Sequence, residues 1–451
     1  MNKSMMAVCL TGCAAAMQFA VAQEVPSNID FDFGGDVRSR YEYKDNWADK
    51  GKASAGSGYE DYLRFRTRLW GKMKAGDDFT TYIRIGNEFR NYRNSSNNDK
   101  LKFPDELFLD NLYGEWKNDS FGVKIGRQDI KKGEGRVISD GTPGDGSRTT
   151  HFDAAVLTLN FAEKSSIDLI GTWNHYRDDL TLGDTEVGVY DMTKIKSGDP
   201  YSKMDEYGLI AYAEIREYEE MPIDTYWIWK TEEDFYSKDE KYPGRDFHTV
   251  GIRVMPKLTD WLSAEVEAAY QFGSVDAAEG FESRDINAGM LYGGLTATPK
   301  DVAWDPSITL AMLYLSGDKD SYYKTTDGST DSGWNPVFNR SSWFSEIGSG
   351  MYDEARWSNL VYPHVEIGVK PAKGHKVTVQ AGPMYAAEKD NGATDDYKGF
   401  FAKAKYGFPL PTVAGVKLGG AVAGEMLNYG DYYDAAENTA TWLRFEVTAK
   451  F

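Results

Sequence analysis

One repeated pattern restricts the fold of this chain more than any other feature: apolar and polar residues alternate over long segments. Residues 262–272 show the alternation, and so do residues 29–41, 63–69 and 443–451. Because successive side chains of a strand point to opposite faces, each segment predicts a strand with one apolar and one polar face. Several segments reach about ten residues, the length that a membrane-spanning strand needs, whereas soluble strands usually have roughly five or six.

The alternation predicts eighteen strands, and the connections between them differ in length according to their position in the series. Predicted strand starts lie near residues 29, 59, 79, 106, 120, 153, 165, 207, 222, 247, 260, 284, 306, 358, 375, 397, 413 and 441. Short turns follow the even-numbered strands at residues 75–77, 117–119, 162–164, 256–258 and 371–374. Longer polar linkers follow odd-numbered strands at residues 44–58, 91–105, 130–152, 176–206, 232–246, 318–356 and 429–440.

Short turns on one rim and long loops on the other are typical of an outer-membrane barrel. We therefore predict an all-β protein, a transmembrane antiparallel β-barrel of 18 strands that forms one domain over residues 23–451. The alternative is a large soluble all-β protein such as a propeller or solenoid. No internal repeat with a fixed period of about 20–50 residues supports that alternative.

Composition excludes several other classes. The chain has 451 residues and a net charge of −19, and no run of about 18 apolar residues suggests a membrane-spanning helix. Nucleic-acid binding needs a basic surface, which an excess of acidic residues does not provide. With 29 tyrosines, 22 phenylalanines and 12 tryptophans, the chain is too rich in aromatic residues for a disordered acidic polymer.

The N-terminal segment predicts export from the cytoplasm. Lys3 precedes a short apolar stretch, and Ala20-Val21-Ala22 matches a cleavage motif, so residues 1–22 are predicted to be a secretory signal peptide. The alternative is a lipobox around Cys13, which would make Cys13 a lipidated N-terminus. Both cysteines of the chain lie in this segment, so cleavage after Ala22 leaves no disulfide or cysteine-based metal site.

The polar face of the predicted strands lines the barrel interior, and part of it is basic. We name one group of these residues the arginine wall: Arg38, Arg40, Arg64, Arg66, Arg68, Arg84 and Arg444. These residues lie on the first three predicted strands and on the last, which must pair with the first to close a barrel. We therefore expect one continuous basic surface, with Glu265 and Glu267 of the eleventh strand across the interior.

Two interpretations of the arginine wall remain open. Guanidinium groups bind carboxylates through two hydrogen bonds, so a row of them offers a track for a sugar acid or a polyanion. Alternatively, the arginines pair with carboxylates of neighbouring strands and stiffen the barrel. Residues 1–150 carry 23 basic and 22 acidic residues, and the remainder carries 28 and 48, so the net charge arises after residue 150.

Much of the acid lies in the long linkers, for example at Asp178, Glu232 and Asp318. We interpret these residues as solubilising groups that face lipopolysaccharide and its divalent ions, although carboxylates also suit a Ca²⁺ site. No EF-hand spacing, nucleotide-binding loop, metal-ligand spacing or redox motif is present, so we expect no cofactor and no metal site.

Two stretches resemble a known family. Leu63–Leu69 reads LRFRTRL, and Gly126-Arg127-Gln128 leads through Gly135-Arg136-Val137 to Arg148 and then Phe152-Asp153-Ala154-Ala155. These motifs are similar to those of the alginate-export family of outer-membrane porins over roughly residues 29–161. Ala154 stands where the family usually has glycine, and two extra residues separate Arg148 from Phe152.

The resemblance implies a monomeric, anion-selective porin. By that analogy the pore-lining or constriction residues are Arg64, Arg66, Arg68, Arg84, Arg127, Arg136 and Arg148. The glycine-rich linker 130–152 either folds inward to narrow the pore or remains an ordinary exposed loop. We expect the protein in the bacterial outer membrane, in contact with lipid and lipopolysaccharide, passing small anionic or sugar-like solutes.

Other expectations concern assembly and alternative functions. Phe451, at the end of an alternating strand, resembles the C-terminal signal that the bacterial barrel-assembly machinery binds. A structural or adhesive barrel is one alternative function, and an outer-membrane hydrolase is another. None of the five histidines lies in a recognisable catalytic motif, so we predict that the chain is not an enzyme.

Overall fold

The computed structural model describes thirteen parts of the chain. They are residues 28–47, 58–93, 107–139, 151–175, 181–182, 204–237, 240–278, 282–319, 330–339, 344–347, 358–389, 393–433 and 439–451. The predicted signal peptide, with Cys13, and the predicted pore residue Arg148 lie outside these described residues. Across the described parts, no helix has both the length and the apolar character to cross a membrane.

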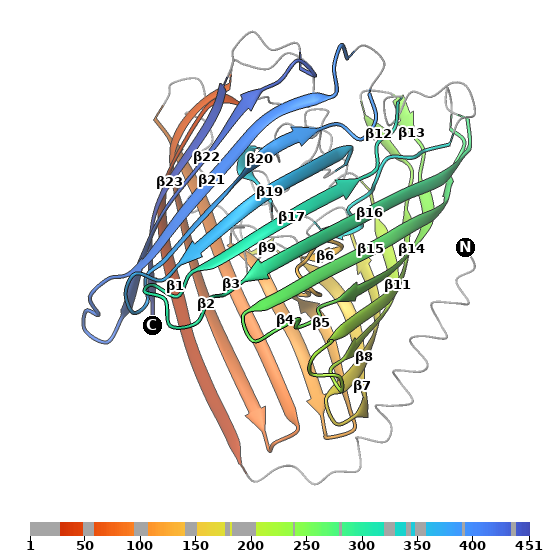
Figure 1. Cartoon of the computed structure of the whole chain (residues 1–451). Helices are drawn as coiled ribbons and strands as arrows, with labels where there is room; N and C mark the ends of the chain where they lie inside the picture. The colour runs from red at the N-terminus through yellow and green to blue at the C-terminus, as the bar shows by residue number, and fades with distance from the viewer. Residues whose placement is uncertain are drawn as a thin grey trace.

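Eighteen antiparallel strands form the wall of a closed barrel, as the sequence predicts (Figure 1). In order they are β1 (Ile29–Trp47), β2 (Gly58–Ala75), β3 (Phe79–Tyr92), β4 (Leu107–Lys117), β5 (Phe121–Gln128), β7 (Phe152–Ala162), β8 (Ser165–Asn174), β10 (Glu206–Ile215), β11 (Ile223–Glu232), β14 (Arg245–Val254), β15 (Leu262–Val275), β16 (Arg284–Ala297), β17 (Ser307–Leu315), β19 (Leu360–Val369), β20 (Lys376–Tyr385), β21 (Tyr397–Pro409), β22 (Lys417–Tyr429) and β23 (Thr439–Lys450).

Pairing of the first strand with the last closes the sheet. β1 pairs with β23 from Asp36 opposite Lys450 to Asp45 opposite Thr441. Figure 1 shows the two ends of the colour range side by side at this seam. Every predicted strand start lies within four residues of an observed one; the largest difference is at β22, predicted to begin at 413.

Five short strands lie outside this circuit. They are β6 (Ile138–Ser139), β9 (Thr181–Leu182), β12 (Phe235–Ser237), β13 (Glu240–Tyr242) and β18 (Phe338–Asn339). β12 and β13 form a hairpin in the β11–β14 connection, and β9 pairs with the first two residues of β4. β6 and β18 pair with each other in parallel, although they come from two different connections.

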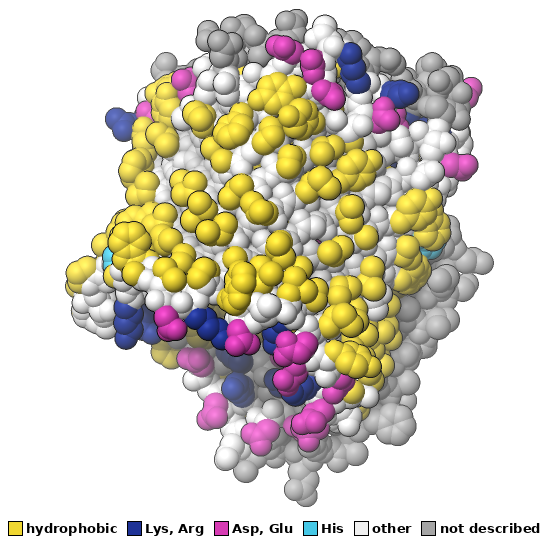
Figure 2. All heavy atoms as spheres, in the orientation of Figure 1, with side chains coloured by type: hydrophobic (Ala, Val, Ile, Leu, Met, Phe, Trp, Pro, Cys, Tyr) yellow, Lys and Arg dark blue, Asp and Glu magenta, His cyan; other side chains and the backbone are white. Residues whose placement is uncertain are grey.

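The alternation in the sequence places apolar residues on the outside of the barrel and polar residues on the inside. Phe33 is 83% exposed on the outer face and Leu310 is 56% exposed, whereas Arg40 on the inner face is 2% exposed. Figure 2 shows apolar side chains spread over the outer face and charged side chains gathered towards its edges. Lipid contact stabilises such an outer face and leaves the polar face to water or to other protein groups.

Connection length follows the predicted parity. Residues 76–78 join β2 to β3 and residues 163–164 join β7 to β8, whereas residues 175–205 lie between β8 and β10. The longest connection, residues 316–359, joins β17 to β19. The barrel therefore has one rim of short turns and one of long loops, as in outer-membrane barrels.

The outward face predicts a depth-dependent cost for charge. Leu310 lies in the middle of β17, so we expect Leu310→Arg to lower the free energy of unfolding in lipid vesicles by about 2–4 kcal/mol. Leu258 is also exposed but lies in the β14–β15 turn, so we expect Leu258→Arg to cost about 0–1 kcal/mol. Urea titration of both variants measures the difference, and equal losses would contradict a lipid-facing position for Leu310.

Candidate pore lining and inward segments

The arginine wall lies on the inner face of β23, β1, β2 and β3, where the sequence places it. Strand pairing sets Arg38 opposite Arg66 and Arg40 opposite Arg64 across β1 and β2. Like charges directly opposite each other destabilise a sheet unless counter-charges separate them. The guanidinium groups therefore need carboxylates between them.

Carboxylates of the same strands provide these counter-charges. Asp36 accepts a hydrogen bond of 2.8 Å from Arg66 and another of 2.8 Å from Arg68. Glu88 of β3 accepts one of 2.7 Å from Arg64. These charge-assisted bonds are the strongest class of hydrogen bond in proteins.

A second group of ion pairs completes the wall. Glu42 lies 3.4 Å from Arg444 across the closing seam and accepts a hydrogen bond of 2.9 Å from the Tyr62 hydroxyl. Arg84 lies 2.6 Å from Asp110 and 2.8 Å from Asp129, and Arg40 pairs with Glu446.

Counted over the described residues, the charges of the wall nearly balance. Six arginines of the wall form ion pairs with seven carboxylates: Asp36, Glu42, Glu88, Asp110, Asp129, Glu346 and Glu446. The expectation of a continuous basic surface is therefore too simple. Carboxylates lie among the arginines on this face because strand pairing would otherwise place guanidinium groups against one another without counter-charges.

Arg127 is buried in the barrel wall rather than set freely in the lumen. Its guanidinium donates to both Asp153 oxygens of β7, at 2.9 and 3.0 Å, and to the Leu109 carbonyl of β4 at 3.1 Å. Arg127 lies on β5 opposite Leu112 of β4 and Asp153 of β7, so these bonds tie the three strands together next to the end of β5 at Gln128. Gly126 has a φ of 126°, and an added Cβ would lie 2.2 Å from a backbone oxygen, which explains the glycine of this motif.

The connection after β5 folds into the barrel over residues 129–139, which we name the first inward segment. Arg136 at its tip donates to Glu265 and to Glu267 of β15, each at 2.6 Å. Its guanidinium also lies 3.7 Å from the ring centre of Tyr292. The two glutamates lie on the inner face of β15 and bind this segment.

A second connection enters the barrel and meets the first. Residues 330–339 between β17 and β19 form the second inward segment, and their strand β18 pairs with β6. Val337 and Phe338 are fully buried. Lys230 of β11 donates to the Val337 carbonyl at 2.7 Å, and Gln271 of β15 donates to the Asn335 carbonyl at 2.7 Å.

The alternation in the sequence did not predict that residues 330–339 enter the barrel. The signal that could have indicated it is a group of large apolar residues within an otherwise polar linker: Trp334, Val337 and Phe338. Each is at most 2% exposed, because inward-facing apolar residues of the barrel strands surround the segment. Phe152 of β7, for example, packs edge-on against Phe338 with ring centres 5.7 Å apart.

Asp331 holds the second inward segment near β16. The Asn287 N–H donates to the Asp331 carbonyl at 2.9 Å, and the Asp331 N–H donates to the Asp285 carbonyl at 2.8 Å. The Asp331 carboxylate lies 3.8 Å from the guanidinium of Arg284. Burial raises the pKa of the Asp331 carboxyl in spite of this nearby positive charge. Burial therefore destabilises the ionised form of Asp331, which lies within the second inward segment.

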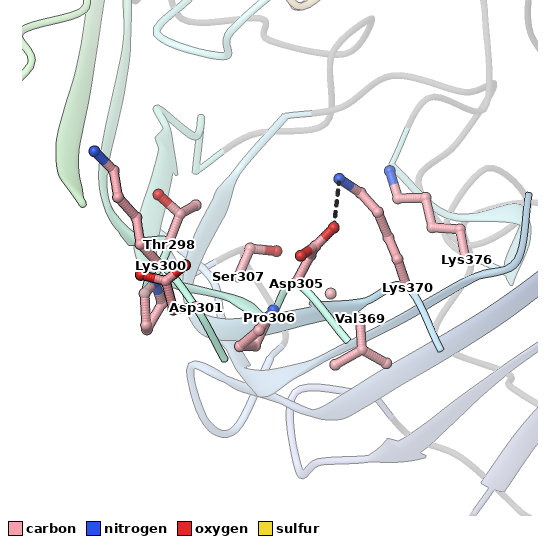
Figure 3. Close-up of a pocket in the computed structure, with 11 residues that line it drawn as sticks. Thr298, Lys300, Asp301, Asp305, Pro306, Ser307, Val369, Lys370 and Lys376 are labelled. Atoms are coloured by element: carbon pink, nitrogen blue, oxygen red, sulfur yellow. Dashed lines mark ion pairs between the residues drawn. The ribbon is translucent and has the colours of Figure 1, made fainter. Parts of the chain in front are cut away.

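A separate hollow lies on the rim of short turns (Figure 3). Its volume is about 480 Å³, and its lining includes Lys300, Asp305, Lys370 and Lys376. Lys370 and Asp305 lie 4.0 Å apart, and both side chains are more than half exposed. These mixed, solvated charges lie away from the inward segments. Within the described residues, no three histidine, aspartate or glutamate side chains converge on a possible metal position.

Comparison with known proteins identifies relatives in sequence and in fold. A sequence profile described as alginate export matches residues 30–396. A search of curated protein sequences found no match. Three solved structures from Pseudomonas aeruginosa are similar in fold. OpdQ shares 12% identity at a TM-score of 0.59, with 94% of this chain and 98% of that chain covered.

The other two structures are the outer membrane protein OpdK and OccK2 (OpdF) in complex with glucuronate. OpdK shares 10% identity at a TM-score of 0.59, over 95% of this chain and 100% of that chain. OccK2 shares 11% identity at a TM-score of 0.58, over 93% and 96%.

The contacts of Arg136 predict that its replacement widens the pore. In Arg136→Gln the glutamates at 265 and 267 lose a shared cation, a loss that costs roughly 3–5 kcal/mol at buried pairs. We expect the first inward segment to move away from β15 and the single-channel conductance in a planar bilayer to rise. Lys131→Gln removes the same charge from an exposed side chain of that segment and serves as the control. An unchanged conductance in Arg136→Gln would show that the segment does not narrow the path.

Proposed function

The chain belongs to the alginate export family, and on that premise we propose how this outer-membrane channel conducts anionic solutes. A solute carboxylate enters the barrel and exchanges with the carboxylates that the arginine wall already binds. It passes from one guanidinium group to the next along β1, β2 and β23. Transport is passive, and the chain catalyses no reaction.

The observation that carries this proposal is the sharing of carboxylates between arginines. Asp36 bridges Arg66 and Arg68, and Glu42 lies within ion-pair distance of both Arg64 and Arg444. When a guanidinium exchanges one carboxylate for another, the number of charge-assisted hydrogen bonds stays constant. A carboxylate therefore has a similar binding free energy at neighbouring positions, whereas a neutral or cationic group lacks this interaction.

The inward segments restrict which solutes pass. The first inward segment reaches β15 at Glu265, and the second is fixed to β11 and β15. Their apolar residues pack into a buried cluster with inward-facing residues of the barrel strands. A solute is thereby directed along the charged side. OccK2, a protein of similar fold, was solved with glucuronate, and a sugar acid of this kind is our candidate solute class.

The remaining proposals concern assembly and location. We propose that the first 22 residues direct export and that Phe451 presents the C-terminal strand to the barrel-assembly machinery. Phe451 exchanges two backbone hydrogen bonds with Gly35, at 2.9 and 3.1 Å, while its side chain remains 57% exposed. We also propose a monomer, since the strand circuit closes within one chain and needs no second copy to complete the barrel.

Ion selectivity tests the role of the arginine wall. We expect the triple variant Arg64→Gln, Arg66→Gln, Arg68→Gln to shift the reversal potential in a KCl gradient toward cation preference, because Asp36 and Glu88 lose their counter-charges. Asp36→Asn should shift it the opposite way. Replacement of the three arginines by lysine keeps the charge and should keep the sign of selectivity, while weakening block by glucuronate.

A triple glutamine variant with unaltered selectivity would refute the guiding role. If the wild-type barrel inserts into bilayers but never conducts, the chain is instead a structural or adhesive barrel. Both outcomes are read from the same recordings.

A further inference from the structure

The hollow on the rim of short turns lies on the inner side of the barrel (Figure 3). Its lining includes Ser307 of β17, Gly368 of β19 and Lys376 of β20. The neighbouring residues Ile308 and Ile367 are 42% and 44% exposed on the outer face. Because successive side chains of a strand point to opposite faces, positions 307 and 368 face the lumen. Short turns of such barrels lie on the periplasmic side, so the hollow lines the periplasmic mouth.

Two connections enclose this hollow. Residues 298–306 join β16 to β17 and form the longest connection on the rim of short turns. The main-chain N–H of Lys370, directly after β19, donates to the Trp304 carbonyl at 2.6 Å and ties the two connections together. Trp304 and Asp305 have φ angles of 73° and 45°, a left-handed backbone that few residues other than glycine adopt. Such strained backbone is found mainly at ligand clamps, active sites and switch regions.

The glycine at position 368 leaves room for the Ser307 hydroxyl. A Cβ added to Gly368 would lie 2.5 Å from that hydroxyl oxygen, so any larger residue there would displace it. The hollow has a volume of about 480 Å³. Sites for small molecules usually have volumes of roughly 300–1,000 Å³, so a solute of the size of one sugar can enter.

The charges of the hollow are only partly paired. Lys370 lies 4.0 Å from Asp305, and the two side chains are 62% and 76% exposed. Figure 3 shows this pair, with the Lys376 side chain on the same side of the hollow as that of Lys370. Lys376 forms no ion pair with any residue that the structure describes. Residues 367–387 contain three lysines and no aspartate or glutamate, so a carboxylate that enters the hollow meets positive charge on this side.

We propose that the hollow is a binding site for a sugar acid at the periplasmic mouth of the channel. The Lys376 ammonium binds the solute carboxylate, while the Ser307 hydroxyl and the Asp305 carboxylate bind ring hydroxyls. The proposal rests on the proposed channel function and adds a binding position that is separate from the arginine wall.

The groups that line the hollow favour a solute with one carboxylate and several hydroxyls. Lys370 and Lys376 attract an anion, whereas Asp301 and Asp305 repel a second negative charge and accept hydrogen bonds from hydroxyls. Because Lys370 and Asp305 are largely solvated, binding at this position is weak. Weak binding suits a channel mouth, where a solute must enter and also leave.

Loss of the Lys376 charge tests the proposal. Calorimetry with glucuronate uses the detergent-solubilised full chain carrying Arg64→Gln, Arg66→Gln and Arg68→Gln, in which the arginine wall is weakened. We expect Lys376→Gln in this background to weaken the remaining glucuronate binding by about tenfold, because a charge-assisted hydrogen bond is lost. Lys373→Gln is the matched control, since Lys373 lies in the same turn and does not line the hollow. It should leave the affinity unchanged.

A second pair of variants tests the shape of the hollow without changing its charge. Gly368→Ala displaces the Ser307 hydroxyl and should weaken glucuronate binding several-fold. Gly293→Ala is its control, because a Cβ added at Gly293 meets no atom within 4 Å. Glucose, which lacks the carboxylate, and acetate, which lacks the ring hydroxyls, should each bind more weakly than glucuronate.

The lysine variants are also compared in the otherwise wild-type chain. Equilibrium dialysis measures the number of glucuronate molecules bound per barrel. We expect Lys376→Gln to lower this number and Lys373→Gln to leave it unchanged. This comparison does not depend on the folding of the triple arginine variant.

The outcomes distinguish this site from the channel function. If the two lysine variants weaken glucuronate binding equally, or neither weakens it, the site is refuted. Anion selectivity of the wild-type barrel in that case leaves the channel function intact. If binding depends on Lys376 and Gly368 while the wild-type barrel prefers cations, the site stands and the proposed conduction is wrong.

Discussion

Closure of the sheet by the pairing of β1 with β23 is the constraint on which the rest of the structure depends. In hydrocarbon every backbone N–H and C=O must be bonded within the protein, and a closed circuit of strands meets that requirement without an edge. Closure also divides the side chains into two sets. The outward set is apolar, and every charge of the strands must be accommodated inside.

The two sides of the interior differ in the side chains that they bury. Along β23, β1, β2 and β3, arginines are separated by carboxylates, so that like charges opposed by strand pairing are neutralised. Across the lumen, two inward segments bury an apolar cluster around Ile138 and Phe338. In the proposed function, a solute therefore passes beside these ion pairs.

Local pattern was sufficient to predict the barrel but not its interior. The alternation around Glu265 and Val266 predicts that Glu265 faces the lumen and Val266 faces lipid, because that assignment depends on neighbouring residues alone. The meeting of Arg136 with Glu265 joins residues 129 positions apart, and no local period encodes it. The bonds of Arg127 to Asp153 and to the Leu109 carbonyl likewise depend on how β5 pairs with β4 and β7, which no local pattern encodes.

The central claim is that the paired arginines and carboxylates of the arginine wall select for solutes that carry a carboxylate. Uptake into proteoliposomes containing the wild-type barrel tests it most directly, with glucuronate, glucose and glucosamine compared at equal concentration. These solutes share a ring and differ mainly in charge. We predict that glucuronate enters fastest and glucosamine slowest. Equal rates for all three, or the reverse order, would contradict the account.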